Sequence, residues 1–190
     1  MNMKSLINYE VIEQKTLKDL QSEGYLLRHK KTGARVVLME NDDENKVFSI
    51  GFRTPTDDST GVIKVIADCY NAAPESMAAA LNVLKTCGGK RIAVLGDMLE
   101  LGEHSEALHE SVGKAVEGCA DMLICVGEEA KYIALAAEKI MNKEDIYVYP
   151  SADYEKAAKL VAETAKEGDT VLFKASNRTN LRKVMEITAL

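Results

Sequence analysis

Three polar stretches, each following a short apolar run, contain the side chains of this chain that could do chemistry. They read DCYNAAPES from Asp68, GDMLELGEHS from Gly96 and KASNRTN from Lys174. Amide, hydroxyl and ammonium groups at the start of a helix suit the binding of phosphates and carboxylates, because the free N–H groups there also favour anions. The three stretches therefore predict a binding site for small anionic molecules.

The first stretch has the side chains that a nucleotide would need. Asp68 could accept hydrogen bonds from a ribose, Tyr70 could cover a base and Asn71 could donate to a phosphate. Pro74 fits the first position of the helix that follows. Asp and Asn are also common helix caps, so capping by Asp68 or Asn71 is an alternative that the spacing leaves open.

The second stretch places acidic and apolar residues together between Gly96 and Gly102. Apolar side chains in a loop at a strand end favour contact with a ligand or a partner surface. The alternative is that Leu99 and Leu101 fold back onto the core. The candidate substrate-binding residues are Asp97, Met98, Leu99 and Glu100.

The third stretch opens the last helix with a lysine, a hydroxyl and an amide, which together suit a carboxylate or a phosphate. Its candidate substrate-binding residues are Lys174, Ser176 and Asn177. The alternative is again a helix cap, made by Ser176 or Asn177.

Several catalytic and metal-binding patterns are missing from the sequence. It has neither Gly-x-x-x-x-Gly-Lys-Ser/Thr nor Gly-x-Gly-x-x-Gly, so no phosphate-binding loop is expected. No motif places a nucleophile beside a base, so the sequence predicts no catalytic residue. His104 and His109 are five residues apart, which turns about 140° around a helix and separates their faces. We expect a solvated helix face there and no metal site.

Five short apolar runs alternate with helical stretches from residue 62 onward. The runs are residues 62–67, 91–96, 122–127, 146–150 and 170–175, with helices expected over 74–87 and 153–166. This alternation predicts an α/β domain with a Rossmann-like, five-stranded, mainly parallel sheet and helices on both faces. In such sheets ligands bind beyond the carboxyl ends of the strands, which is where the three polar stretches fall.

The first 61 residues have a different pattern. Alternating runs over 25–30, 34–40 and 46–52 predict a small antiparallel β-meander. Three strands bury too little to be stable alone, so we expect this segment to be mobile or to dock on the α/β domain. The expected domains are therefore residues 1–61 and residues 62–190.

The composition is that of a soluble globular protein, and its cysteine usage leads us to expect a reducing cytoplasm. Apolar residues make up 46% of the 190 residues and charged residues 28%. No apolar run could span a membrane and no secretory signal is present. The net charge of −6 argues against a nucleic-acid partner. We expect free, mostly buried thiols at the four cysteines, which are Cys69, Cys87, Cys119 and Cys125.

The order DCYNAAPESM, RIAVLGDMLELGEHSEALH and DTVLFKASN resembles the C-terminal domain of the Mur ligases. The resemblance covers residues 62–190 and is strongest to the branch that joins D-alanyl-D-alanine to UDP-N-acetylmuramoyl-tripeptide in peptidoglycan synthesis. It implies ATP with Mg as cofactor and D-alanyl-D-alanine as a ligand.

In that family a central domain holds ATP on a phosphate loop, and the C-terminal domain closes over the nucleotide and presents the dipeptide. The resemblance implies that the Asp97 loop faces the cleft between the domains, that Lys174 and Ser176 line the dipeptide side, and that the nucleotide contacts are Asp68, Tyr70, Asn71 and Pro74. Because this sequence has no phosphate loop, we expect the chain to be incomplete and inactive alone.

The sequence departs from the family pattern at two places. Ala73 stands where the family usually has asparagine, so a helix cap worth about 1 kcal/mol is expected to be missing. After Ser176 the family has a basic turn that contains glycine, which Asn177, Arg178 and Thr179 only approximate.

The segment from Tyr9 to Gly61 is similar to the start of the insulinase-type zinc peptidases of the presequence-protease branch. The zinc motif His-x-x-Glu-His of that family is absent, so no zinc is expected. The chain therefore reads as the head of one enzyme joined near Gly61 to the tail of another. Two alternatives are a non-catalytic module that docks another protein or domain at its exposed cleft face, and a remnant of a zinc peptidase.

Overall fold

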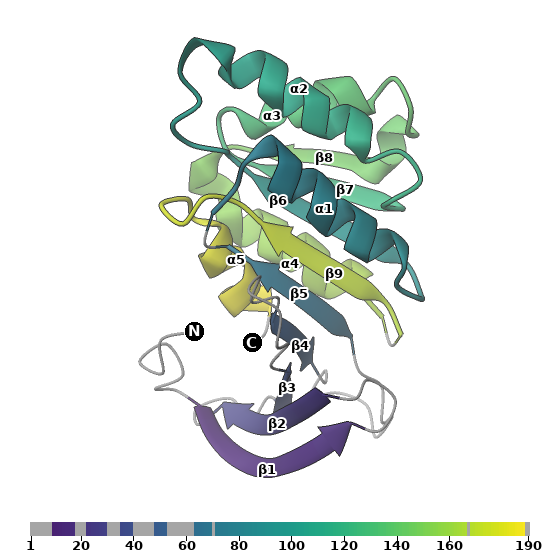
Figure 1. The fold of residues 1–190 in the computed structure, drawn as a ribbon, viewed down its shortest axis with the longest axis vertical. Coiled ribbons are helices and arrows are strands. Elements are labelled where there is room, and N and C mark those ends of the chain that lie inside the picture. The colour runs from purple at the N-terminus through teal and green to yellow at the C-terminus, as the bar shows by residue number, and fades with distance from the viewer. Residues whose placement is uncertain are drawn as a thin grey trace.

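The α/β part of the chain is built on five parallel strands (Figure 1). The computed structural model describes residues 9–17, 22–29, 35–39, 48–52, 63–69, 71–166 and 168–188. Across the sheet the parallel strands are β5 (Lys64–Asp68), β9 (Thr170–Lys174), β6 (Arg91–Gly96), β7 (Met122–Val126) and β8 (Ile146–Tyr149). The predicted five-stranded α/β fold is confirmed, and all five of these strands, rather than most of them, are parallel.

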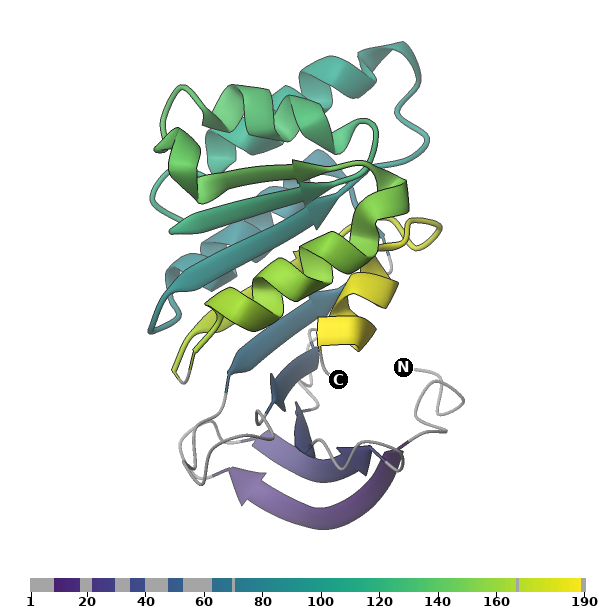
Figure 2. The ribbon, with the colours of Figure 1, turned by 180° about the vertical axis from the view of Figure 1, so that it is seen from behind.

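Helices cover both faces of this sheet (Figures 1 and 2). One face carries α1 (Pro74–Lys85), α2 (Ser105–Ala115) and α3 (Ala130–Ala137), and the other carries α4 (Tyr154–Thr164) and α5 (Leu181–Thr188). Short 3-10 turns precede α2, β8 and α4, at η2 (Gly102–His104), η3 (Lys143–Asp145) and η4 (Ser151–Asp153). The expected helices over 74–87 and 153–166 are present. Helix α1 ends two residues earlier than expected, and α4 begins one residue later and ends two residues earlier.

Alternate residues of each central strand join two different cores. In β6, Ile92 and Val94 pack with α4 and α5, while Ala93 and Leu95 pack with α1, α2 and α3. Every residue of β7 and β9 is buried. Strands covered on both faces are uninterrupted apolar runs, which explains why their positions are readable from the sequence.

Four further strands precede β5 in the chain. They are β1 (Tyr9–Leu17), β2 (Ser22–His29), β3 (Arg35–Met39) and β4 (Phe48–Phe52), paired antiparallel in chain order. The backbone of β4 pairs antiparallel with β5, where Phe48 is opposite Ala67 and Ser49 is opposite Ile66. It stays a prediction that residues 1–61 form a separate meander, either mobile or docked on the α/β domain.

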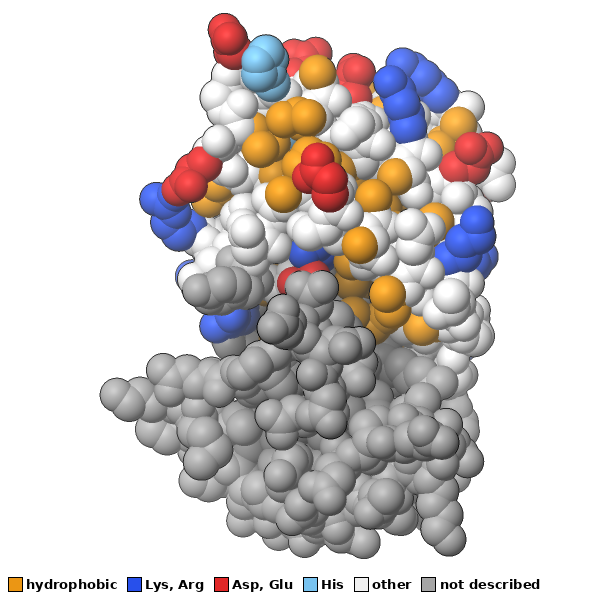
Figure 3. Space-filling model, in the orientation of Figure 1, with side chains coloured by type: hydrophobic (Ala, Val, Ile, Leu, Met, Phe, Trp, Pro, Cys, Tyr) orange, Lys and Arg blue, Asp and Glu red, His pale blue; other side chains and the backbone are white. Residues whose placement is uncertain are grey.

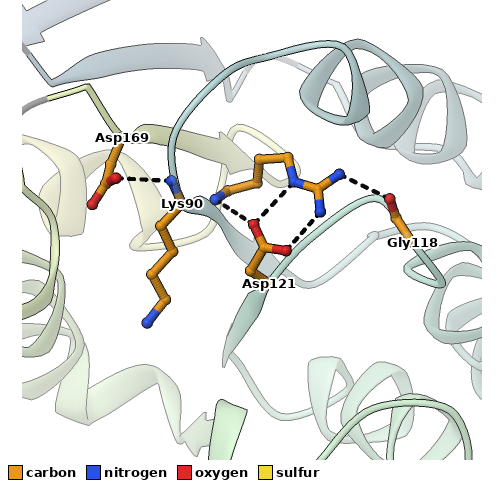
Figure 4. Close-up of polar contacts among 5 residues, drawn as sticks. Lys90, Gly118, Asp121 and Asp169 are labelled. Atoms are coloured by element: carbon orange, nitrogen blue, oxygen red, sulfur yellow. Dashed lines mark hydrogen bonds and ion pairs between the residues drawn. The ribbon is translucent and has the colours of Figure 1, made fainter.

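An ion pair joins the amino ends of β6 and β7 (Figure 4). The Nη2 and Nε atoms of Arg91 donate to the two carboxylate oxygens of Asp121 at 2.6 and 3.0 Å, and Nη1 donates to the Gly118 carbonyl at 2.9 Å. Hydrogen bonding to Arg91 lowers the pKa of Asp121 and raises that of Arg91. The backbone N–H of Lys90 donates to Asp169 alongside, at 2.8 Å.

All four cysteines carry free thiols, and three of them are buried. This confirms the expectation of unpaired thiols. None of the helices that the structure describes has the length and apolar character needed to cross a bilayer.

Candidate functional site

The last residues of β5 and β9 lie opposite each other in the sheet and form an ion pair. The Nζ atom of Lys174 donates to Oδ2 of Asp68 at 2.6 Å and to the carbonyl oxygen of Asn71 at 2.9 Å. The side chain of Lys174 is 1% exposed and that of Asp68 is 28% exposed. Two predicted contact residues from opposite ends of the domain sequence are therefore bound to each other.

The burial of Lys174 explains why its two acceptors matter. Moving an ammonium group out of water costs on the order of several kcal/mol unless charged and polar partners replace the water. The Asp68 carboxylate and the Asn71 carbonyl provide this replacement. Oδ1 of Asp68 accepts no hydrogen bond within the described part of the chain, and the side chain reaches the surface.

Helix α1 begins without help from Asp68 or Asn71. Its N-cap is Ala73, whose backbone N–H donates to the Ser76 hydroxyl at 3.0 Å. The alternative in which Asp68 or Asn71 caps this helix is therefore wrong. The side chain of Asn71 is exposed, Pro74 is at the first helical position, and Tyr70 lies outside the described residues.

Ser76 also compensates in part for Ala73, which stands where the family usually has asparagine. An alanine cannot accept a hydrogen bond through its side chain, so the side-chain cap is missing as expected. The hydroxyl of Ser76 instead bonds both the N–H and the carbonyl of Ala73, each at 3.0 Å. Half of a capping box thus remains.

The carboxylate of Asp97 caps a different helix from the one that follows it. Its oxygens accept the backbone N–H groups of Glu128, Glu129 and Ala130 at 3.1, 3.0 and 2.7 Å, where α3 begins. Asp97 is 8% exposed. The side chain therefore joins the β6 loop to the β7 loop, and a direct contact with substrate stays a prediction.

Met98 and His109 hold the next part of the loop inside the protein. Met98 is 1% exposed, and its backbone N–H donates to Nε2 of His109 at 3.0 Å. Since Nε2 accepts, the proton is on Nδ1, which donates to the Ser105 carbonyl at 2.8 Å. Met98 therefore packs in the core and is not exposed at the surface of the loop. The solvated position expected for His109 is wrong, because His109 is fully buried, whereas His104 is exposed.

Ser176 connects the β6 loop to the β9 loop. Its backbone N–H donates to the Asp97 carbonyl at 3.1 Å, and its hydroxyl accepts the N–H of Leu99 at 3.0 Å. Helix α5 begins only at Leu181, so the hydroxyl of Ser176 serves the neighbouring loop rather than the helix cap. The alternative in which Ser176 caps the helix is therefore wrong.

Outside these contacts the two loops meet at the surface. Glu100, which has a positive φ of 67°, forms an exposed ion pair with Arg178. Leu101 is partly buried against the core cluster beneath α1, α2 and α3, as one alternative expected. Leu99 is half-buried, and Asn177 is exposed. Exposed groups of both loops, Glu100 and Asn177 among them, are thus available to a ligand.

Hydrogen bonds link loops from all five parallel strands along their carboxyl ends. Asn180 donates to the Ser151 carbonyl at 3.2 Å, which adds the β8 loop to those of β5, β6, β7 and β9. Hydrogen bonds thus join the loops at the carboxyl ends of the parallel strands into one continuous surface.

On the face of α1 and α2, charged side chains are dispersed among hydrophobic ones (Figure 3). The described residues contain no cluster of three or more metal-ligating side chains.

Sequence comparison shows the family of proteins to which this domain belongs. The model of the family described as "Mur ligase, glutamate ligase domain" matches residues 55–177. The chain belongs to the Mur ligase family through this domain.

The most similar relatives include two ligases of one type. UDP-N-acetylmuramoyl-tripeptide–D-alanyl-D-alanine ligase of Bacillus subtilis is 34% identical over 127 residues, which is 65% of this chain and 27% of that protein. The enzyme of the same name from Escherichia coli is 42% identical over 74 residues, 38% of this chain and 16% of that protein. The chain thus spans about a quarter or less of the length of these relatives.

A second similarity covers about a third of the chain. Presequence protease 1 of Arabidopsis thaliana is 40% identical over 60 residues, which is 32% of this chain and 6% of that protein. Part of the chain is therefore similar to presequence protease, as the sequence indicated.

Solved structures share the fold. MurF ligase from Thermotoga maritima in complex with ADP aligns with 95% of this chain and 45% of its own, at a TM-score of 0.59 and 22% identity. A crystal structure of MurF from Acinetobacter baumannii gives a TM-score of 0.61 at 21% identity, over 94% of this chain and 44% of its own. At such identities the likeness is one of fold.

Proposed function

We propose that this chain is the C-terminal domain of an ATP-dependent ligase that adds D-alanyl-D-alanine to UDP-N-acetylmuramoyl-tripeptide in the cytoplasm. It works only with a nucleotide-binding domain, on another chain or on another part of a longer protein. The observation that carries this proposal is the hydrogen-bonded edge of loops, which groups Asp68, Asn71, Glu100 and Asn177 beyond the carboxyl ends of parallel strands.

The proposed roles divide this edge into two sides. Asp68, Tyr70, Asn71 and Pro74 form the side that contacts Mg-ATP. The dipeptide side is the loop of Asp97, Met98, Leu99 and Glu100 together with Lys174, Ser176 and Asn177. Because Asp97, Met98 and Ser176 are buried, we propose that they shape this side. The exposed Asn177 and Glu100, the latter paired with Arg178, are proposed to contact the dipeptide.

The proposed reaction explains why the chain needs a partner domain. The tripeptide carboxylate attacks the γ-phosphorus of ATP and ADP leaves. The amine of D-alanyl-D-alanine then attacks the acyl phosphate, phosphate leaves and the amine loses a proton. The first step needs a γ-phosphate and magnesium held in line with the carboxylate. The sequence has no phosphate-binding loop to do this, so the chain provides one side of the site.

The test is an amide ¹H–¹⁵N spectrum of the whole chain, titrated with Mg-ATP and then with D-alanyl-D-alanine. We expect saturable shifts in residues 68–76 with the nucleotide and in residues 96–102 and 174–180 with the dipeptide. L-alanyl-L-alanine is the control and leaves the spectrum unchanged. A dispersed spectrum that responds to neither ligand would contradict the proposal and favour a docking module.

We also infer that the chain changes identity near Gly61, with residues 1–61 and 62–190 as its two domains. In support, the family match begins at residue 55, and the similarity to presequence protease spans 60 residues. Limited trypsin digestion tests this inference. We expect cleavage between Lys15 and Arg53 before any cleavage within α1 to α5. Resistance of the first segment in a folded chain would show one cooperative unit instead.

A further inference from the structure

One buried ammonium holds both ends of the turn between β5 and α1. Asp68 is the last residue of β5, and Asn71 lies three residues before Pro74, where α1 begins. Nζ of Lys174 is 2.6 Å from the carboxylate of the first and 2.9 Å from the carbonyl of the second. The conformation of the turn is therefore tied to the position of a single side chain.

The exposure of the three groups is unequal. Lys174 is 1% exposed, whereas the Asp68 side chain is 28% exposed and Asn71 lies at the surface. A ligand that approaches this edge meets the carboxylate and the amide before it could reach the ammonium. Lys174 fixes which oxygen of Asp68 points inward. The other oxygen, Oδ1, accepts no hydrogen bond from the residues that the structure describes and could take a hydroxyl donor.

We propose that Lys174 is a positioning residue for nucleotide binding, which orients Asp68 and the turn to Asn71 and does not itself touch a ligand. This inference rests on the proposed function, because that proposal places the nucleotide at the turn. For Lys174 it replaces the place on the dipeptide side that the resemblance implied and that the proposed roles above retained.

The chain offers a matched control at the opposite edge of the sheet. Arg91 and Asp121 also form an ion pair 2.6 Å long between neighbouring strands, at the amino ends of β6 and β7 (Figure 4). Loss of that pair removes an ion pair of the same length, although a more exposed one, without touching the turn. Comparison of Lys174→Met with Arg91→Met therefore separates positioning from a general effect on stability.

The experiment measures the dissociation constants of Mg-ATP and D-alanyl-D-alanine for the wild-type chain and both variants, by titration of amide spectra. We expect Lys174→Met to weaken Mg-ATP binding at least tenfold, to shift the amides of Asn71 and Ala72 before any ligand is added, and to change dipeptide binding by less than threefold. Arg91→Met should leave both constants within threefold of wild type.

Binding of Mg-ATP to folded Lys174→Met within threefold of wild type would overturn the inference, and so would an equal loss in Arg91→Met. If the wild-type chain bound no nucleotide, the proposed function would fail, and positioning would be judged from amide exchange. In that case unchanged exchange at Asn71 and Ala72 in Lys174→Met would reject it. If Lys174→Met does not fold, Lys174→Gln, which keeps two N–H donors, is measured against the same criteria.

Discussion

The carboxylate of Asp97 lies against the α-carbon of Gly127, so closely that a β-carbon on Gly127 would overlap it. Gly127 also has a φ of +145°, which side chains rarely adopt. Both features serve the cap on α3, because the chain must pass the carboxylate for the N–H groups of Glu128, Glu129 and Ala130 to reach it.

Gly127→Ala should therefore destabilise the chain by about 3 kcal/mol, the sum of backbone strain and a displaced cap. Gly118→Ala is the control, since Gly118 has a φ of +65° but open space around it. That change should cost about 1 kcal/mol, from the backbone alone. Urea unfolding measures both, and equal losses would show that contact with Asp97 adds nothing.

The buried His109 gives a second prediction. His109→Leu removes the acceptor of the Met98 N–H and leaves a buried donor unsatisfied, which costs about 1–3 kcal/mol. His109→Gln keeps an acceptor and should lose less. Urea unfolding ranks the two variants, and amide exchange at Met98 reports the bond directly. A smaller loss for leucine than for glutamine would mean that burial of the imidazole, not its hydrogen bond, is what counts.

The Arg91–Asp121 pair predicts a pH dependence. The pKa of Asp121 is lowered in the folded chain, so its stabilising contribution is complete above its ordinary pKa, about 4. The contribution disappears as the pH falls through the lowered value. Asp121→Asn should therefore reduce stability at pH 7 and lose this difference at more acidic pH.

The size of that effect should be small. The Asp121 side chain is 40% exposed, so solvent and salt screen the pair to about 0.5–1 kcal/mol. Thermal unfolding from pH 2 to pH 7 measures it, with 0.5 M NaCl as the screened control. A difference between wild type and variant that grows as the pH falls would contradict the assigned direction.

The cysteines should differ in reactivity. Burial raises the pKa of the Cys69 thiol to about 12 and also raises that of Cys125, so very little reactive thiolate is present at pH 8. Cys119 is buried and Cys87 is half-buried. A disulfide reagent should label one thiol quickly in the native chain and four in denaturant. Cys87→Ser should remove the fast phase, and rapid native labelling of Cys69 would contradict the prediction.

The strands of the α/β domain could be predicted because each is an apolar run that two layers of helices bury. The positions of the loops followed from the same pattern. What the loops do with their side chains did not follow, since their partners are far away along the chain. Asp68 and Lys174 are 106 residues apart, and Asp97 is 33 residues from Ala130.

Local patterns also misled at single residues. Asp68, Asn71 and Ser176 have the chemistry of helix caps, but each is used across the sheet edge or exposed instead. His109 gives no sign of burial in its own segment, because the group that it bonds, the Met98 N–H, belongs to a loop eleven residues earlier. Tertiary contacts decided these positions, and a local sequence pattern holds no information on them.

The place of β9 in the sheet has a consequence for synthesis of the protein. β9 is the last strand in the chain, yet it lies between β5 and β6 and pairs with both. When a nascent chain has emerged only as far as α4, β5 and β6 each still lack the neighbour that β9 later provides between them. Completion of the sheet must wait for translation of residues 170–174, and until then the backbone N–H and C=O groups on these sides of β5 and β6 have no strand to pair with.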